Sequence, residues 1–190
     1  MEKNPTPITR QRILDRCFVA FNQKGFFAVS VDSIAKDLKI SKKTIYKHCS
    51  SKEEMVEENL VQLFARFEEK LSKSKKQANS KSQLQDFFEI LKTWRMSIST
   101  ILKTDLANHL PHLFERIENF ERQVLLRQLT AGLKEMRAEG EIDFPSPSRE
   151  FSAVLLQVMK SLSDVHAPQA EFMLSTILRG MSMKKKKKDK

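Results

Sequence analysis

Apolar residues recur every three to four positions along most of the chain, which is the spacing of helices that bury one face. The first stripe follows Thr9, a good N-cap, and runs to Gly25, which can end a helix in a left-handed conformation. The second begins after Ser30 and ends at Leu38. No segment shows the strict alternation of a half-buried strand. The pattern therefore predicts an all-α protein of about nine helices.

A very short helix is expected between Ser41, which can cap it, and His48. Only Ile45 within it is plainly a core residue, and a helix of this length must be held by its neighbours in water. Its other positions are cations or hydrogen-bond donors: Lys42, Lys43, Thr44, Tyr46, Lys47 and His48. Two short helices joined by a tight turn, with a basic outer face, are typical of a DNA-binding helix-turn-helix. The alternative is a basic, solvated helix hairpin.

The fourth helix begins at a capping box, Ser51-Lys52-Glu53-Glu54, and its apolar stripe continues to about residue 74. The free amides at its start, with Lys52 beside them, predict a phosphate site. Because the stripe continues beyond the helix-turn-helix, this helix is expected to link that domain to the rest of the chain. Further helices are expected at about 82–103, at a short segment from Thr104 interrupted by Pro111, at about 112–139 before Gly140, at about 149–163, and after Pro168.

The net charge of +10 is unevenly distributed. Residues 1–52 carry a net charge of +7 and residues 184–190 carry +5, whereas the 131 residues between them carry −2. The excess positive charge thus lies on the predicted helix-turn-helix and on the C-terminal tail. This distribution favours a polyanionic partner at one face over a protein that is basic throughout.

Residues 8–60 resemble the N-terminal domain of the TetR family of transcriptional repressors. The resemblance is carried by Gly25-Phe26, by Ser30 to Leu38, by Ile40-Ser41-Lys42-Lys43-Thr44-Ile45-Tyr46-Lys47-His48, and by Ser51-Lys52-Glu53-Glu54. The family usually has Phe where this chain has Cys49, which suggests a smaller contact beneath the short helix. Beyond residue 60 the chain resembles the family only in its general layout.

The resemblance implies a helix-turn-helix domain at 1–52 and a helical effector-binding and dimerisation domain at 53–183. The run of lysines at the C-terminal end predicts a basic, disordered tail at 184–190. The resemblance places Lys42, Lys43, Thr44, Tyr46, Lys47 and His48 at the DNA contacts. Lys52 is expected to contact DNA as well, because its charge lies at the start of the fourth helix and can neutralise a phosphate. The resemblance also implies a homodimer formed by the last two helices, at about 149–180. The alternative for those two amphipathic helices is that they close the core of the monomer.

The resemblance further implies an apolar pocket for a small effector in the body of the protein. Its candidate lining residues are Phe64, Phe67, Phe87, Trp94, Ile98, Phe114 and Phe120. Aromatic residues at helical spacing are more often core than ligand contacts, so a filled core is the competing interpretation.

Motifs for catalysis and for metal or cofactor binding are not found. The chain has no glycine-rich phosphate loop and no Ser-x-x-Lys, Gly-x-Ser-x-Gly or His-Glu-x-x-His motif. His109 and His112 are three residues apart, but Pro111 between them breaks the helical geometry that a metal site needs. We therefore expect no enzyme activity, no metal and no cofactor.

The composition indicates a cytoplasmic protein. No apolar run approaches the roughly 20 residues that span a bilayer, and the first residues lack the apolar stretch of a signal peptide. The two cysteines, Cys17 and Cys49, are expected to be buried thiols.

The sequence thus predicts a sequence-specific DNA-binding regulator, a repressor released from a palindromic operator by a small apolar ligand. Two alternatives remain: a dimeric DNA-binding scaffold protein without an effector, and a small-molecule carrier that has lost DNA binding.

Overall fold

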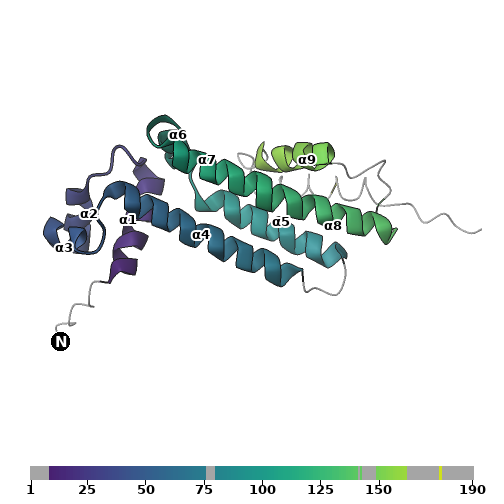
Figure 1. Cartoon of the computed structure of the whole chain (residues 1–190), viewed down its shortest axis with the longest axis horizontal. Coiled ribbons are helices and arrows are strands. Elements are labelled where there is room, and N and C mark those ends of the chain that lie inside the picture. Colours follow the sequence, from purple (N-terminus) through teal and green to yellow (C-terminus); the bar gives the residue numbers. More distant parts are fainter. Residues whose placement is uncertain (1–8, 76–79, 141, 143–148, 162–175, 177–190) are drawn as a thin grey trace, which may run out of the picture. The chain divides into compact units, whose positions relative to one another are not determined.

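The computed structural model describes residues 9–75, 80–140, 142, 149–161 and 176 (Figure 1). Within those residues every element is a helix, so the predicted all-α fold is confirmed. The N-terminal helices are α1 (Arg10–Lys24), α2 (Val31–Leu38), α3 (Lys42–Tyr46) and α4 (Lys52–Ser74). They are followed by α5 (Ser80–Ser97), α6 (Thr100–His109), α7 (Pro111–Phe120), the π-helical turn η1 (Glu121–Leu125), α8 (Leu126–Ala138) and α9 (Arg149–Ser161).

The prediction of a single helix at 82–103 is wrong at its C-terminal end, because α5 ends at Ser97 and α6 begins at Thr100. Ser99 separates the two helices: its side chain accepts a hydrogen bond from Leu102 N at 3.1 Å, and its own amide donates to Asn22 Oδ1 at 2.7 Å. The apolar stripe runs through this break without interruption. A serine inside a continuous stripe does not by itself show that one helix ends and another begins there. The short helix expected from Thr104 is therefore the second half of α6.

The long helix expected at 112–139 is interrupted by a single π turn, η1. A π turn contains one more residue than an α turn, and the buried side chains Phe120 and Leu125 at its two ends are five residues apart. One longer step in an otherwise three- to four-residue pattern does not reveal the π turn from the sequence. The helix expected after Pro168 lies outside the described residues. None of the helices in the described part of the chain is long and apolar enough to cross a membrane.

The chain forms two compact units. The first unit comprises the described residues within Met1–Arg66 and Ser97–Glu118, and the second comprises those within Phe67–Met96 and Asn119–Lys190. Helices α4, α5 and α7 contribute residues to both. The functional boundary that we expect near residue 52 remains a prediction.

The first unit has its core where α1, α2, α3 and the start of α4 bury their apolar faces. Ile13, Ile34, Ile45 and Val56 are all fully buried. Both cysteines are free and buried, as the sequence predicts. Burial raises the pKa of the Cys17 thiol to about 12 and also raises that of Cys49, so both remain protonated at neutral pH.

The second unit contains an aromatic cluster around Trp94. The Trp94 ring stacks on Phe120 with centroids 4.6 Å apart and meets Phe67 edge-on at 5.1 Å. The indole Nε1 donates to Oε1 of Glu121, a buried carboxyl in the π turn, at 3.1 Å. The cluster therefore satisfies the one polar atom of its central side chain internally.

Candidate nucleic-acid interface

The turn between α2 and α3 is a helix C-cap of the Schellman type. Lys39 N donates to Lys36 O at 3.1 Å and Ile40 N donates to Ala35 O at 3.0 Å, which satisfies two carbonyls at the end of α2. Lys39 has a left-handed backbone with φ of 56° and ψ of 42°. It has the only positive φ of any non-glycine residue in the described part of the chain. The turn thus imposes strain that a glycine would relieve.

Replacing Lys39 with Gly is therefore expected to stabilise the first unit by about 0.5–1 kcal/mol, because glycine adopts the left-handed conformation without strain. The matched control is Lys36→Gly within α2, which should destabilise by about 1 kcal/mol. Thermal unfolding followed by circular dichroism measures both. Equal destabilisation by the two substitutions would show that the turn is not strained at Lys39.

Helix α3 has five residues and is held from one side by Ile45, which is fully buried. Its N-terminus is capped by Ser41, whose hydroxyl oxygen accepts from Thr44 N at 3.0 Å. A helix this short gains too few internal bonds to persist alone. The buried Ile45 and the cap therefore orient the whole outer face of α3.

The outer face of α3 presents Lys43, Tyr46 and Lys47 to solvent. Tyr46 is 45% exposed although it is aromatic. Neither lysine forms an ion pair with any residue that the structure describes. The face thus offers two unpaired cations and a phenol hydroxyl, which are groups that bind phosphates and base edges.

Among the other predicted contacts near α3, the side chains of Lys42 and Thr44 already have partners within the protein, whereas His48 is bonded through its backbone carbonyl. Lys42 Nζ lies 2.9 Å from Asp32 Oδ2, and this hydrogen bond raises the pKa of the Lys42 ammonium. Thr44 Oγ1 lies 2.9 Å from Ser41 Oγ, and the His48 carbonyl accepts from Arg10 Nε at 2.9 Å. The Lys42–Asp32 pair is exposed, so it is weak and can exchange for a phosphate at little cost.

Lys52 lies at the start of α4 and bonds to the loop between α1 and α2. Its Nζ donates to Phe26 O at 2.8 Å and to Val29 O at 3.0 Å, and it lies 4.2 Å from the centroid of the Phe26 ring. Burial lowers the pKa of this ammonium, while the charge of Asp105 acts in the opposite direction. An ammonium has three donors, so one remains for the phosphate contact that the sequence predicts.

Replacing Lys52 with Ala tests two roles at once: its hydrogen bonds to the loop and its predicted contact with a phosphate. Loss of the two bonds to the loop is expected to destabilise the first unit by about 1 kcal/mol. If the third donor binds a phosphate, DNA affinity falls about equally for all sequences and the salt slope falls by about 0.9 for each subunit bound. Thermal unfolding and binding at several salt concentrations separate the two. A loss confined to one preferred DNA sequence would contradict the phosphate role.

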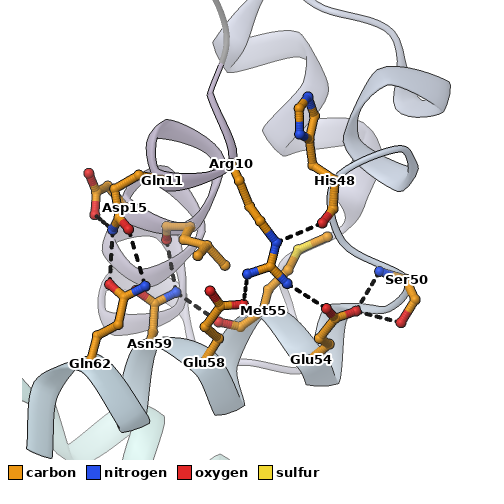
Figure 2. Close-up of polar contacts among 11 residues, drawn as sticks. Arg10, Gln11, Asp15, His48, Ser50, Glu54, Met55, Glu58, Asn59 and Gln62 are labelled. Carbon is orange, nitrogen blue, oxygen red and sulfur yellow. Dashed lines mark hydrogen bonds and ion pairs between the residues drawn. The ribbon is translucent and has the colours of Figure 1, made fainter. Parts of the chain in front are cut away.

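A polar network centred on Arg10 holds the end of the helix-turn-helix against α1 and α4 (Figure 2). The guanidinium donates to the His48 carbonyl, to Glu58, and to Glu54 Oε1 at 2.6 Å. Glu54 also accepts bonds from Ser50, which lower the pKa of its carboxyl. Nothing in the sequence pattern shows that Arg10, among the arginines of α1, is the one that points inward.

Helix α6 contacts the C-terminal end of α1 through a second set of polar bonds. Asp105 Oδ2 accepts from Phe27 N at 2.9 Å, and a Cβ on Gly25 would lie only 2.4 Å from the same oxygen. Gly25 also has a φ of 85°, so two independent features require glycine there. His109 stacks on Phe27 with centroids 4.8 Å apart, and His112 Nε2 lies 3.1 Å from Glu53 Oε1. The two histidines thus have different neighbours.

The predicted pocket residues are divided between the two units. Phe67, Phe87, Trp94 and Phe120 are buried in the second unit, and Phe64, Ile98 and Phe114 belong to the first. Phe67, Trp94 and Phe120 contact one another directly. Whether these residues line an effector site remains a prediction.

The fold and the basic outer face of α3 define a helix-turn-helix protein with an all-helical body. Residues 13–58 match the model of the family described as bacterial regulatory proteins, tetR family. The N-terminal domain of this chain is thus a tetR-type helix-turn-helix domain. A comparison with curated proteins gives no significant match.

Solved structures with the same fold cover nearly the whole chain. The ketosteroid transcriptional regulator KstR2 of Mycobacterium tuberculosis is 20% identical, with a TM-score of 0.71 over 94% of this chain and 98% of that chain. AibR in complex with isovaleryl coenzyme A and operator DNA is 15% identical, with a TM-score of 0.66 over 91% and 97%. The superantigen PfiT is 16% identical, with a TM-score of 0.68 over 98% and 100%. At these identities the likeness defines the fold alone.

Proposed function

We propose that this protein is a sequence-specific transcriptional regulator that binds an operator in double-stranded DNA. The observation that carries the proposal is the outer face of α3, where Lys43 and Lys47 are exposed and unpaired beside Tyr46 within the part of the chain that the structure describes. The tetR-type match at residues 13–58 supports the same assignment. The proposal places the protein in the cytoplasm and involves no cofactor and no catalytic step.

The proposed contacts divide between base reading and phosphate binding. Lys43 and Lys47 are long donors that can reach the acceptors of guanine in the major groove. Tyr46 donates its hydroxyl to a phosphate, and Lys52 neutralises a second one. Thr44 contacts a thymine methyl or a phosphate, and Lys42 and His48 contact the backbone. Phosphate contacts set the register, so only one or two of these residues discriminate bases.

The proposed operator is a palindrome read by a homodimer, because two recognition helices related by a two-fold axis read two half-sites in successive major grooves. The exposed valines of α9 support dimerisation through the C-terminal helices. Val154 is 63% exposed and Val158 is 37% exposed, and they lie one helical turn apart. Two apolar side chains on one turn are typical of an interface stripe.

Selection of preferred sequences from a random pool of duplexes tests the regulator assignment directly. The expected result is an inverted repeat whose half-site centres lie about one helical turn apart or a multiple of it. Sedimentation of the complex should give two protein chains per selected duplex. Enrichment of no sequence above the starting pool would contradict the proposal.

We further propose that a small ligand with an apolar part releases the protein from its operator. AibR, which shares this fold, was solved in complex with isovaleryl coenzyme A and operator DNA, and this supports ligand-responsive control. The buried aromatic side chains of the second unit supply apolar contact area. A ligand that binds better to the conformation unsuited to DNA lowers operator affinity by shifting the population.

The competing function is that of a DNA-binding scaffold protein without an effector. The two differ in sequence preference and in ligand response. A screen of small apolar acids and their thioesters, read as loss of operator binding, is expected to find at least one compound that releases the DNA. Failure of every compound in the presence of strong sequence preference would contradict the effector alone and leave DNA recognition intact.

A further inference from the structure

A groove rich in cations lies on the second unit, between the η1–α8 segment and the start of α9. It has a volume of about 430 Å³ and contains four basic side chains: Arg122, Arg127, Lys134 and Arg149. Gln123 and Thr130 add hydrogen-bonding groups to its wall. No carboxylate of a described residue lines it. The DNA-binding role proposed for α3 makes no use of this site.

The spacing along η1 and α8 places these side chains on one helix face. Arg127, Thr130 and Lys134 follow one another on α8 at steps of three and four residues, which is the spacing of one helix face, and Arg122 and Gln123 line the groove from η1. Arg149, the first residue of α9, lines the same groove, and α9 packs against α8. The basic lining thus comes from two helices that are separated in sequence.

The four cations have no ion-pair partner among the residues that the structure describes. Elsewhere in the same part of the chain, basic side chains are commonly paired, as Arg10 is with Glu54 and Arg116 is with Glu57. Four like charges around one concave site repel one another and raise the local potential. An anion in the groove would remove that repulsion.

We propose that this groove binds a small molecule that carries a di- or triphosphate group. Arginine forks match phosphate oxygens with two parallel hydrogen bonds, and a group of several negative charges is needed to balance four cations. The volume lies in the range of about 300–1,000 Å³ found for small-molecule sites. A duplex is a less suitable occupant, because protein elements that read DNA protrude into its grooves, whereas this site is recessed between two helices.

Calorimetric titration with inorganic tripolyphosphate and with ATP tests the proposal on the full-length protein. The site variant is Arg122→Gln with Arg127→Gln, and the control is Arg137→Gln, an exposed arginine of α8 outside the groove. Glutamine is a good helix former, so both variants should keep the wild-type circular dichroism and melting temperature. The site variant is expected to bind tripolyphosphate about a hundredfold more weakly, and the control within a factor of about two of wild type.

Several outcomes would overturn the proposal. In one, the wild-type protein binds neither tripolyphosphate nor ATP; in another, the site variant binds tripolyphosphate as tightly as wild type does; in a third, the control variant loses as much affinity as the site variant. Size-exclusion chromatography and titration with a duplex oligonucleotide complete the test. If the site variant alters the oligomeric state or duplex affinity and leaves tripolyphosphate binding unchanged, the groove is an interface or a nucleic-acid surface instead. Since α3 is unaltered in both variants, failure here leaves the proposed DNA recognition standing.

Discussion

Replacing both Lys43 and Lys47 with Ala is expected to weaken operator binding by a factor of about a hundred or more at physiological ionic strength. Lys43 on α3 and Lys47 directly after it are exposed and unpaired among the described residues, so their removal leaves the fold unchanged and deletes the proposed contacts. A symmetric dimer loses four cations from its DNA-binding face. Fluorescence anisotropy with the selected duplex, measured at several salt concentrations, gives both the affinity and the salt slope.

The control for charge alone is the pair Arg66→Ala and Arg137→Ala, which removes two exposed cations from α4 and α8. It lowers the net charge by the same amount, so non-specific attraction to DNA falls equally. The control variant should bind within a factor of about three of wild type, because long-range charge is screened over roughly 10 Å. Equal loss in both pairs would show that α3 contributes only net charge and does not read the operator.

Replacing Ile45 with Ala is expected to destabilise the first unit by about 3 kcal/mol and to abolish operator binding at temperatures where the wild type binds. Ile45 is fully buried and is the single core residue of a five-residue helix. Truncating it leaves a cavity and removes the contact that fixes the outer face of α3. Chemical denaturation gives the loss of stability, and anisotropy gives the loss of binding.

The matched substitution is Val61→Ala on α4, at a side chain that is 46% exposed. Alanine has the higher helix propensity, so this change should alter stability by less than about 0.5 kcal/mol. A small effect of Ile45→Ala, comparable to that of Val61→Ala, would mean that α3 is held by something other than its buried isoleucine.

The start of each N-terminal helix could be predicted from the sequence because the determinants are local. The side chains of Thr9, Ser30 and Ser41 each accept a bond from an amide three residues on, and Ser51 does the same for Glu54. A cap and the apolar stripe that follows it are both visible in a short window. The pattern predicts that α3 ends at His48, whereas it ends at Tyr46, since helix ends depend on weaker signals.

The charge partners within the site could not be predicted, because they join residues far apart in the chain. Arg10 reaches Glu54 and Glu58, and Lys52 reaches the carbonyls of Phe26 and Val29. Only the packing of α1 against α4 and the loop decides which cations face inward. The sequence therefore identifies the basic face but does not separate the unpaired Lys43 and Lys47 from the paired Lys42.

The break between α5 and α6 escapes prediction for a related reason. Ser99 caps α6 with its hydroxyl oxygen, and its amide donates to Asn22 on α1, a tertiary contact with no counterpart in the local pattern. Trp94 and Glu121 likewise meet across 27 positions, and only the fold makes that carboxyl the partner of the indole. Helical periodicity predicts the buried faces correctly, while the polar contacts between helices stay hidden.

The central claim is that the exposed side of α3 reads a DNA sequence. Its most direct test compares the wild-type protein's affinity for the selected palindrome with its affinity for a scrambled duplex of the same length and composition. At physiological ionic strength the preference should be about a thousandfold or more. Equal affinity for the two duplexes, or no measurable binding to either, would contradict the claim.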